Sequence, residues 1–114
     1  KRTFKKALPE VLARYSTTSG EAVKLLDIDV VTWSRICKGV YEPTKNLLFS
    51  LALTVRMTPE DLEELFGLCG YELDYSLVKD TVIAYLLTRK VYNADMVRRA
   101  LEEYKVTNLF IKEL

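Results

Sequence analysis

Apolar residues recur along the whole chain at intervals of three and four, a spacing that predicts α-helices throughout. The first apolar face lies near the N-terminus and comprises Phe4, Leu8, Val11, Leu12 and Tyr15. Pro9 falls inside this pattern. Because proline lacks the backbone N–H that a helix interior needs, we expect the helix either to start at Ala7-Leu8 or to kink there.

Two short helical patterns joined by a tight turn occupy residues 17–43, which read TTSGEAVKLLDIDVVTWSRICKGVYEP. Residues 18–21 form a capping box that opens the first of them, with three inward candidates, Ala22, Val23 and Leu26. Asp29 is the expected cap of the second, because its carboxylate can accept a backbone N–H bond there. In this second helix Trp33 and Ile36 face inward, and Gly39 closes it in the left-handed conformation that C-terminal caps require.

Two further helices are predicted before residue 70. One starts at Pro43-Thr44 and carries an inner face of five residues, Leu47, Leu48, Leu51, Ala52 and Val55. The other starts at residues 58–61, where a threonine cap, a proline and two acids are typical of a helix N-terminus. Its inner face is Leu62, Leu65, Phe66 and Cys69, and Gly70 ends it.

The second half of the chain predicts two more helices and a tail. Asp74 or Ser76 caps the sixth helix, with four residues expected to face inward, Val78, Val82, Tyr85 and Leu86. Asn93 caps the seventh, with Met96, Val97, Leu101 and Tyr104 inward. The tail at residues 107–111 has no helical face of its own. We expect it either to pack as an extended segment or to pair with a partner.

The charge is distributed unevenly over the 114 residues, although the net charge is only +1. Residues 1–57 hold ten Lys/Arg and five Asp/Glu, a balance of +5, and residues 58–114 hold seven and eleven, a balance of −4. This length fits one domain, and no apolar run approaches the roughly 20 residues of a membrane span. A basic half beside an acidic half favours a polyanion-binding module joined to something else.

The residue types that carry catalysis and metal binding are sparse. The chain has no histidine, which removes the commonest general base and metal ligand. Cys37 and Cys69 cannot form a structural zinc site, and no glycine-rich phosphate loop is present. We therefore expect no enzyme activity, no metal and no cofactor, and we expect both thiols to be reduced and largely buried in a cytoplasmic protein.

With these motifs identified, residues 4–66 resemble the five-helix lambda-repressor-like DNA-binding domain of the Cro/repressor, XRE type, from bacteria and phages. The similarity rests on the turn at residues 26–29, the run at residues 32–36, the Lys38-Gly39 end, Pro43 and residues 51–53. It implies an all-α fold with a helix-turn-helix domain at residues 1–69. Residues 70–114 are then a C-terminal helical extension, packed on the first part as one compact unit.

The resemblance also implies a function and a set of site residues. The helix from Asp29 to Lys38 enters the DNA major groove, and the chain acts as a sequence-specific transcriptional regulator that binds double-stranded DNA. Four positions match those that face base edges: Val30, Val31, Thr32 and Arg35. Four others match phosphate contacts: Ser19, Lys38, Thr44 and Lys45.

Three questions remain open from the sequence. The same fold can serve as a protein-interaction module without DNA binding. Asp29 puts a negative charge at the helix cap near a phosphate, and Val30 and Val31 put apolar side chains at two of the reading positions. A basic stripe through Ser19, Lys38 and Lys45 favours DNA, whereas an apolar patch at Val30, Val31 and Tyr41 with acids around it favours protein. Tyr41 either stacks on sugar or covers the core. Residues 70–114 either form a homodimer contact or fold back to enlarge the monomer's core.

Overall fold

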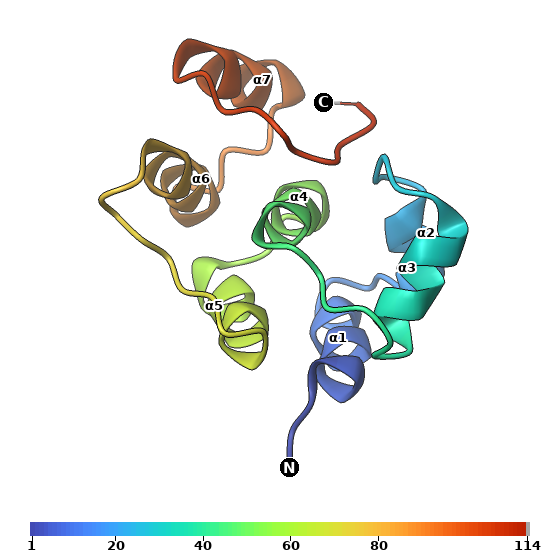
Figure 1. Ribbon diagram of the computed structural model, residues 1–114. Helices are drawn as coiled ribbons and strands as arrows, with labels where there is room; N and C mark the ends of the chain where they lie inside the picture. The colour runs from blue at the N-terminus through green and yellow to red at the C-terminus, as the bar shows by residue number, and fades with distance from the viewer. Residues whose placement is uncertain (114) are drawn as a thin grey trace.

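A computed structural model describes residues 1–113, and within them the chain forms helices and no strands (Figure 1). Their bounds are α1 Phe4–Ala13, α2 Ser19–Val23, α3 Val30–Cys37, α4 Lys45–Val55, α5 Pro59–Leu68, α6 Val78–Thr88 and α7 Ala94–Glu103. One isolated antiparallel bridge joins Leu26 to Ile111. The prediction of an all-α chain is confirmed, and none of the described helices is long and apolar enough to cross a membrane.

Side-chain caps explain where most of the helices begin. Thr18, Asp29, Thr44, Thr58 and Asn93 each accept a backbone N–H bond from the residue three positions later. The caps other than Thr44 were predicted from the sequence, and at Thr44 only the start of a helix was predicted. Thr18 and Glu21 form both halves of the predicted capping box. The predicted cap of α6 is wrong. Asp74 instead accepts bonds from the N–H and hydroxyl of Ser76 in a local turn, and α6 starts later without a side-chain cap.

Of the two alternatives predicted for the first helix, a start at Ala7-Leu8 is wrong. The helix begins at Phe4 because Thr3 caps it and because the Thr3 carbonyl accepts the N–H of Ala7 at 2.9 Å. Pro9 lies inside the helix. The lost backbone bond is offset by burial of the apolar face on both sides of the proline.

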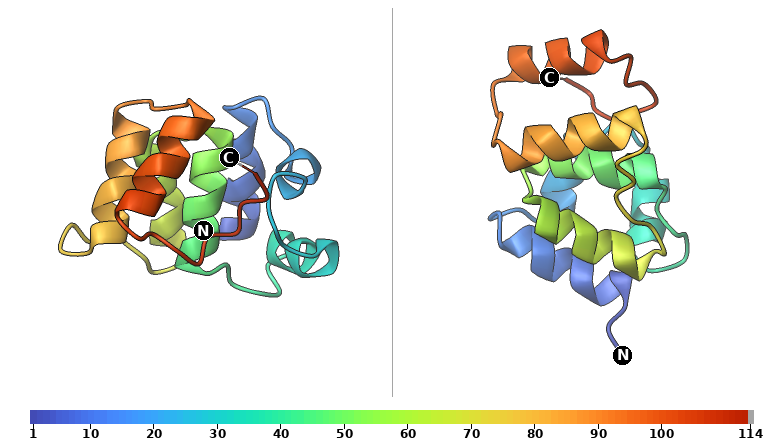
Figure 2. Two further views of the ribbon diagram at one scale, coloured as in Figure 1. Left: turned by 90° about the horizontal axis from the view of Figure 1, so that it is seen from above. Right: turned by 90° about the vertical axis from the view of Figure 1, so that its left-hand side faces the viewer.

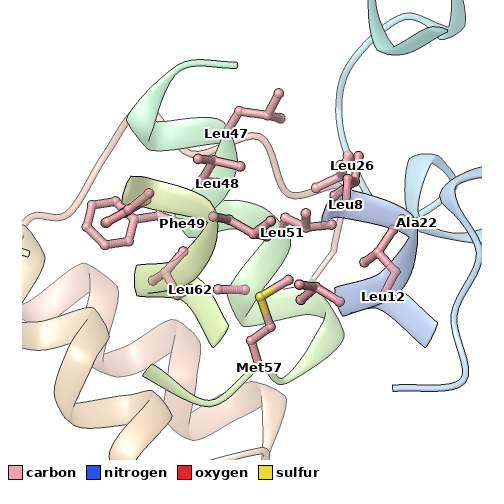
Figure 3. Close-up of a cluster of buried hydrophobic side chains, with 14 of the residues drawn as sticks. Leu8, Leu12, Ala22, Leu26, Leu47, Leu48, Phe49, Leu51, Met57 and Leu62 are labelled. Atoms are coloured by element: carbon pink, nitrogen blue, oxygen red, sulfur yellow. The ribbon is translucent and has the colours of Figure 1, made fainter. Parts of the chain in front are cut away.

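The hydrophobic core is continuous and centres on α4, which contacts α2, α5 and α6. Figure 3 shows leucines of α1, α4 and α5 in one buried cluster that also contains Met57. Phe49 and Phe66 meet edge to face with their ring centroids 5.1 Å apart. Side chains of α6 and α7 join the same core, so the core does not stop at residue 70. Apolar packing therefore ties the C-terminal pair to the rest of the monomer.

The facing of α6 and α7 differs from the prediction at four positions. Val78, Tyr85, Met96 and Tyr104 were expected inside and are all more than half exposed. In α6 the buried side chains are instead Asp80, Ile83, Ala84, Leu86 and Leu87. The helix α6 itself carries apolar residues on nearly all of its sides, so a spacing of three and four residues fits two different inner faces equally well. Burial of Leu86, Val97 and Leu101 was predicted and is confirmed.

The tail at residues 107–113 runs as an extended segment from α7 to the turn between α2 and α3 (Figures 1 and 2). The Asp27 N–H donates to the carbonyl of Phe110 at 2.9 Å, and the Phe110 N–H donates to the hydroxyl of buried Ser50 at 2.8 Å. Leu109, Phe110 and Ile111 are half-buried within the monomer. Of the two expectations, extended packing is the one observed, and the tail is therefore no argument for self-association.

Candidate nucleic-acid interface

Two buried side chains fix the orientation of α3 on the protein. Trp33 and Ile36 are each only 4% exposed and belong to the core, and α3 contacts both α1 and α2. The indole N–H of Trp33 donates to the carbonyl of Ser19 at 2.9 Å, which links α3 to the first residue of α2. The α2–turn–α3 unit is thus held by apolar packing and by one directional bond.

The opposite face of α3 is open to solvent. Val30 is 68% exposed and Val31 is 58% exposed, while Arg35 and Lys38 are exposed one and two turns further along the helix. Ser34 is half-buried between them and was not among the predicted site residues. Figure 2 shows α3 at the edge of the molecule, away from α6 and α7. The C-terminal pair therefore leaves this face of α3 uncovered.

Thr32 does not share this outer face. Its hydroxyl donates to the Asp29 carboxylate at 2.6 Å, and its side chain lines a hollow together with Phe110 of the tail. The hydroxyl and the backbone N–H of Thr32 together hold the pKa of Asp29 below its usual range. Asp29 is consequently negative at neutral pH. The hydroxyl of Thr32 is already bonded to this capping carboxylate.

The expected phosphate contacts are placed in different surroundings. Lys38 is exposed at the C-terminal end of α3, and Thr44 is exposed while its hydroxyl caps α4. Ser19 is half-buried at the start of α2. The ammonium of Lys45 lies 2.6 Å from the carboxylate of buried Asp80. Since its charge is already paired, Lys45 does not extend a basic stripe from Ser19 and Lys38.

A second lysine lies close to the end of α3 and was missed in the sequence. Gly39 has φ of +77° and turns the chain back toward α1, so that a Cβ built there would lie 3.6 Å from the Cβ of Lys5. Lys5 and Lys38 line one hollow. The only sequence signal for Lys5 was the cluster of basic residues at positions 1–6, because no local pattern reports contact across more than thirty residues.

Tyr41 lies on the surface beside Arg35. Its hydroxyl accepts a bond from the Arg35 guanidinium at 3.2 Å, and the guanidinium carbon lies 5.5 Å from the ring centroid. The tyrosine is nearly half exposed, so it does not cover the core. Its contacts restrain the side chain of Arg35. Glu42 follows it, and Asp27, Asp29 and Glu42 line the hollow beside the N-terminal half of α3. This site therefore has apolar and acidic residues near Val30, and at Lys38 it has a hollow that Lys5, Lys38 and Glu42 line together.

Both cysteines are free thiols, and burial raises their pKa values, that of Cys69 to about 11. Because the thiolate is the reactive form, Cys69 should react with Ellman's reagent at pH 8 roughly a hundredfold more slowly in the folded protein than in denaturant. The release of thionitrobenzoate measures this rate. Cys37→Ser, which leaves Cys69 as the single thiol, isolates its rate, and fast labelling of that folded variant would contradict the buried position.

Within residues 1–113, no group of three or more Cys, Asp or Glu side chains is arranged to hold a metal ion. The candidate site consists of the outer face of α3, the lysines Lys5 and Lys38, and the acids Asp27, Asp29 and Glu42. Comparison of the chain with models of protein families, with curated proteins and with solved structures finds no match.

Proposed function

We propose that this chain is a sequence-specific DNA-binding transcriptional regulator of the cytoplasm, in which α1–α5 act as a lambda-repressor-like helix-turn-helix domain. The observation that carries the proposal is the outer face of α3. It is exposed at Val30, Val31 and Arg35 while Trp33 holds the helix from the other side. A short helix that is firmly anchored and uncovered along one face can enter the major groove. The proposal requires no metal or cofactor.

Each exposed residue of α3 has a matching chemistry on base edges. The guanidinium of Arg35 can donate two bonds to one guanine, and Tyr41 already restrains that guanidinium near the surface. The methyl groups of Val30 and Val31 can contact thymine methyl groups. Ser34 joins these residues as a further candidate, whereas Thr32 contributes through the cap at Asp29.

Lys38 is the principal phosphate ligand in this proposal, with Lys5 beside it. Ser19 and Thr44 stay in the proposal as expected contacts at the starts of α2 and α4. Lys45 is left out because Asp80 pairs its charge. The two lysines of the proposal thus lie together at the C-terminal end of α3.

Arg35→Ala is expected to lose discrimination at one base pair by about 1–3 kcal/mol, because a bidentate guanine contact carries sequence information. Competition between duplexes that differ at single positions measures the loss. Arg35→Lys is the matched control, since it keeps the charge and removes the planar fork. Unchanged affinity and unchanged base preference in Arg35→Ala would show that α3 is not the reading helix.

Lys38→Ala and Lys5→Ala are each expected to weaken binding to all duplexes alike and to lower the salt slope by about one. Fluorescence anisotropy on a pool of random duplexes over a range of salt concentrations measures both effects. Lys105→Ala is the control, because Lys105 is exposed beyond α7 and far along the chain from α3. Failure of the unmodified protein to bind any duplex at low salt would refute the DNA proposal.

The apolar and acidic end of α3 favours a second candidate function, that of a protein-interaction module. Val30, Val31 and Tyr41 are all exposed, and Tyr41 lines one hollow with Asp27, Asp29 and Glu42. This arrangement suits a partner with an apolar anchor and basic residues around it. The duplex experiment separates the two functions, because only the regulator binds DNA in a salt-dependent manner.

A further inference from the structure

One flank of α3 is only loosely supported by the other helices. The helix packs chiefly against α1 and α2, and Trp33 bonds to the first residue of α2. On the flank toward α4, Thr32 and Ile36 of α3 and Leu47 of α4 line a hollow of about 470 Å³. Close packing is what normally holds a helix in one position, and a hollow beside a helix leaves it room to shift. Support for α3 on this flank has to come from another part of the chain.

The side chain of Phe110 in the tail lies at this flank. It lines the same hollow as Thr32, Ile36 and Leu47, and it packs against the core. The tail reaches this place as an extended segment that runs from α7 to the loop between α2 and α3 (Figures 1 and 2). Phe110 is therefore an apolar support at the border between α3 and α4.

The backbone of Phe110 joins α4 to the turn that precedes α3. Its N–H donates to the hydroxyl of Ser50 at 2.8 Å, and its carbonyl accepts the N–H of Asp27 at 2.9 Å. Ser50 is fully buried in α4, and its hydroxyl donates to the carbonyl of Asn46 at 2.7 Å, so it is a fixed anchor. Both backbone polar groups of Phe110 thus tie together two segments that are distant in the sequence.

A second backbone bond extends the pairing of the tail with the turn. The N–H of Lys112 donates to the carbonyl of Leu25 at 3.2 Å, and an antiparallel bridge pairs Leu26 with Ile111. Leu26 is completely buried, so this part of the turn is anchored in the core. Backbone groups that are shielded from water need partners, and leaving one unpaired costs more than the bond itself contributes. The tail consequently fixes residues 25–27, two residues before the cap of α3 at Asp29.

We propose that the tail holds α3 in position, with Phe110 as the positioning residue, and so sets the reading helix for DNA. Its backbone fixes the turn before the helix, and its side chain supports the flank beside the hollow. The inference rests on the proposed DNA-binding function. A helix that is held in place before binding loses less conformational freedom in the complex, which raises affinity. The C-terminal pair of helices then serves the site at a distance, because α7 delivers the tail to it.

Amide hydrogen exchange of the full chain, followed by NMR, tests the proposal without DNA. Phe110→Ala removes the supporting side chain and leaves the backbone bonds of the tail in place. Amides of residues 25–37 should then exchange about tenfold faster or more, while those of α4 and α5 should keep their rates. Trp33 is the only tryptophan of the chain, and its fluorescence should become easier to quench with acrylamide, which reports movement of α3 directly.

Leu109→Ala is the matched control, because Leu109 is the neighbour of Phe110, is half-buried like it and lies outside the hollow beside α3. It should change neither the exchange in α3 nor the quenching of Trp33. Phe110→Leu keeps an apolar side chain at the position and should restore most of the protection. Equal effects of Leu109→Ala and Phe110→Ala, or faster exchange throughout α4 and α5, would overturn the proposal, because the tail would then stabilise the whole fold without positioning α3.

Duplex binding separates this proposal from the function on which it rests. Phe110→Ala should weaken binding to the preferred duplex by about tenfold, and Leu109→Ala should leave it unchanged. Faster exchange in α3 without any loss of affinity would overturn the positioning role. If neither the unmodified protein nor a variant binds any duplex, the DNA function is refuted, while the exchange result still supports or overturns the hold of the tail on α3.

Discussion

Trp33→Ala is expected to lower the free energy of unfolding by about 3–5 kcal/mol, the usual range for emptying a large aromatic core site. The side chain is 4% exposed, and its N–H bonds to the Ser19 carbonyl, so the substitution both leaves a cavity and removes a bond between α2 and α3. A small domain has about 5–15 kcal/mol in total, so this loss is a large share. Urea denaturation followed by circular dichroism measures it.

Two substitutions in the same helix give this experiment its controls. Val31→Ala changes an exposed side chain and should alter stability by less than about 0.5 kcal/mol. Trp33→Phe keeps much of the apolar volume and loses the bond to Ser19, so it should fall between the two. A Trp33→Ala variant as stable as Val31→Ala would show that α3 is rotated from the orientation described above.

Asp80→Ala is expected to lower the free energy of unfolding by about 2–4 kcal/mol, because it removes one partner of a buried ion pair. Its side chain is nearly fully buried and accepts bonds from the Lys45 ammonium at 2.6 Å and from the Asp74 N–H at 2.8 Å. Removing one partner of a buried pair leaves the other charge without compensation, which costs about 3–5 kcal/mol. The Lys45 side chain is 26% exposed and can partly reach water, so we place the expected loss slightly lower.

A double-mutant cycle with Lys45→Met and Asp80→Leu measures the interaction energy between the two side chains separately from the cost of removing each charge from water. The double variant replaces both charges by apolar groups of similar size and should be more stable than the Asp80→Leu single variant, which leaves Lys45 unpaired. Chemical denaturation of the four proteins measures the coupling. Additive losses would show that the two side chains do not interact, and that apolar packing and the bond from Lys79 to Asn46 hold α4 against α6 without them.

The starts of most helices could be predicted from the sequence because caps are local. Thr18, Asp29, Thr44, Thr58 and Asn93 each bond to a backbone N–H three residues away, so the residue type and its neighbours suffice. Burial of Trp33 and Ile36 could be predicted for a related reason. The apolar face of α3 is narrow, and only one orientation buries both residues.

The facing of α6 depends on tertiary contacts that the sequence does not show. Asp80 would be placed outside by any hydropathy pattern, yet it is buried because Lys45, thirty-five residues earlier, neutralises it. With Asp80 inside, Val78 and Tyr85 are forced to the surface, where they line a groove between α6 and α7. The same contact removes Lys45 from the candidate site.

The exposed residues of α3 itself could be predicted from the sequence, whereas the residues of other segments that lie beside α3 could not. Exposure of Val30, Val31 and Arg35 follows from burial of Trp33, because these positions lie on the other side of one helix. The approach of Lys5 to Gly39 and of Phe110 to Thr32 depends on packing between distant segments. Residues that surround the reading helix therefore emerge only from the folded chain.

The most direct test of DNA recognition by α3 is a titration of isotopically labelled protein with a duplex pool at low salt, followed by amide chemical shifts in NMR spectra. We expect the largest shifts on the outer face of α3 and at the flanking lysines, from Val30 to Lys38 and at Lys5, with none in the groove between α6 and α7. Shifts confined to other surfaces, or no shifts at all, would contradict the account.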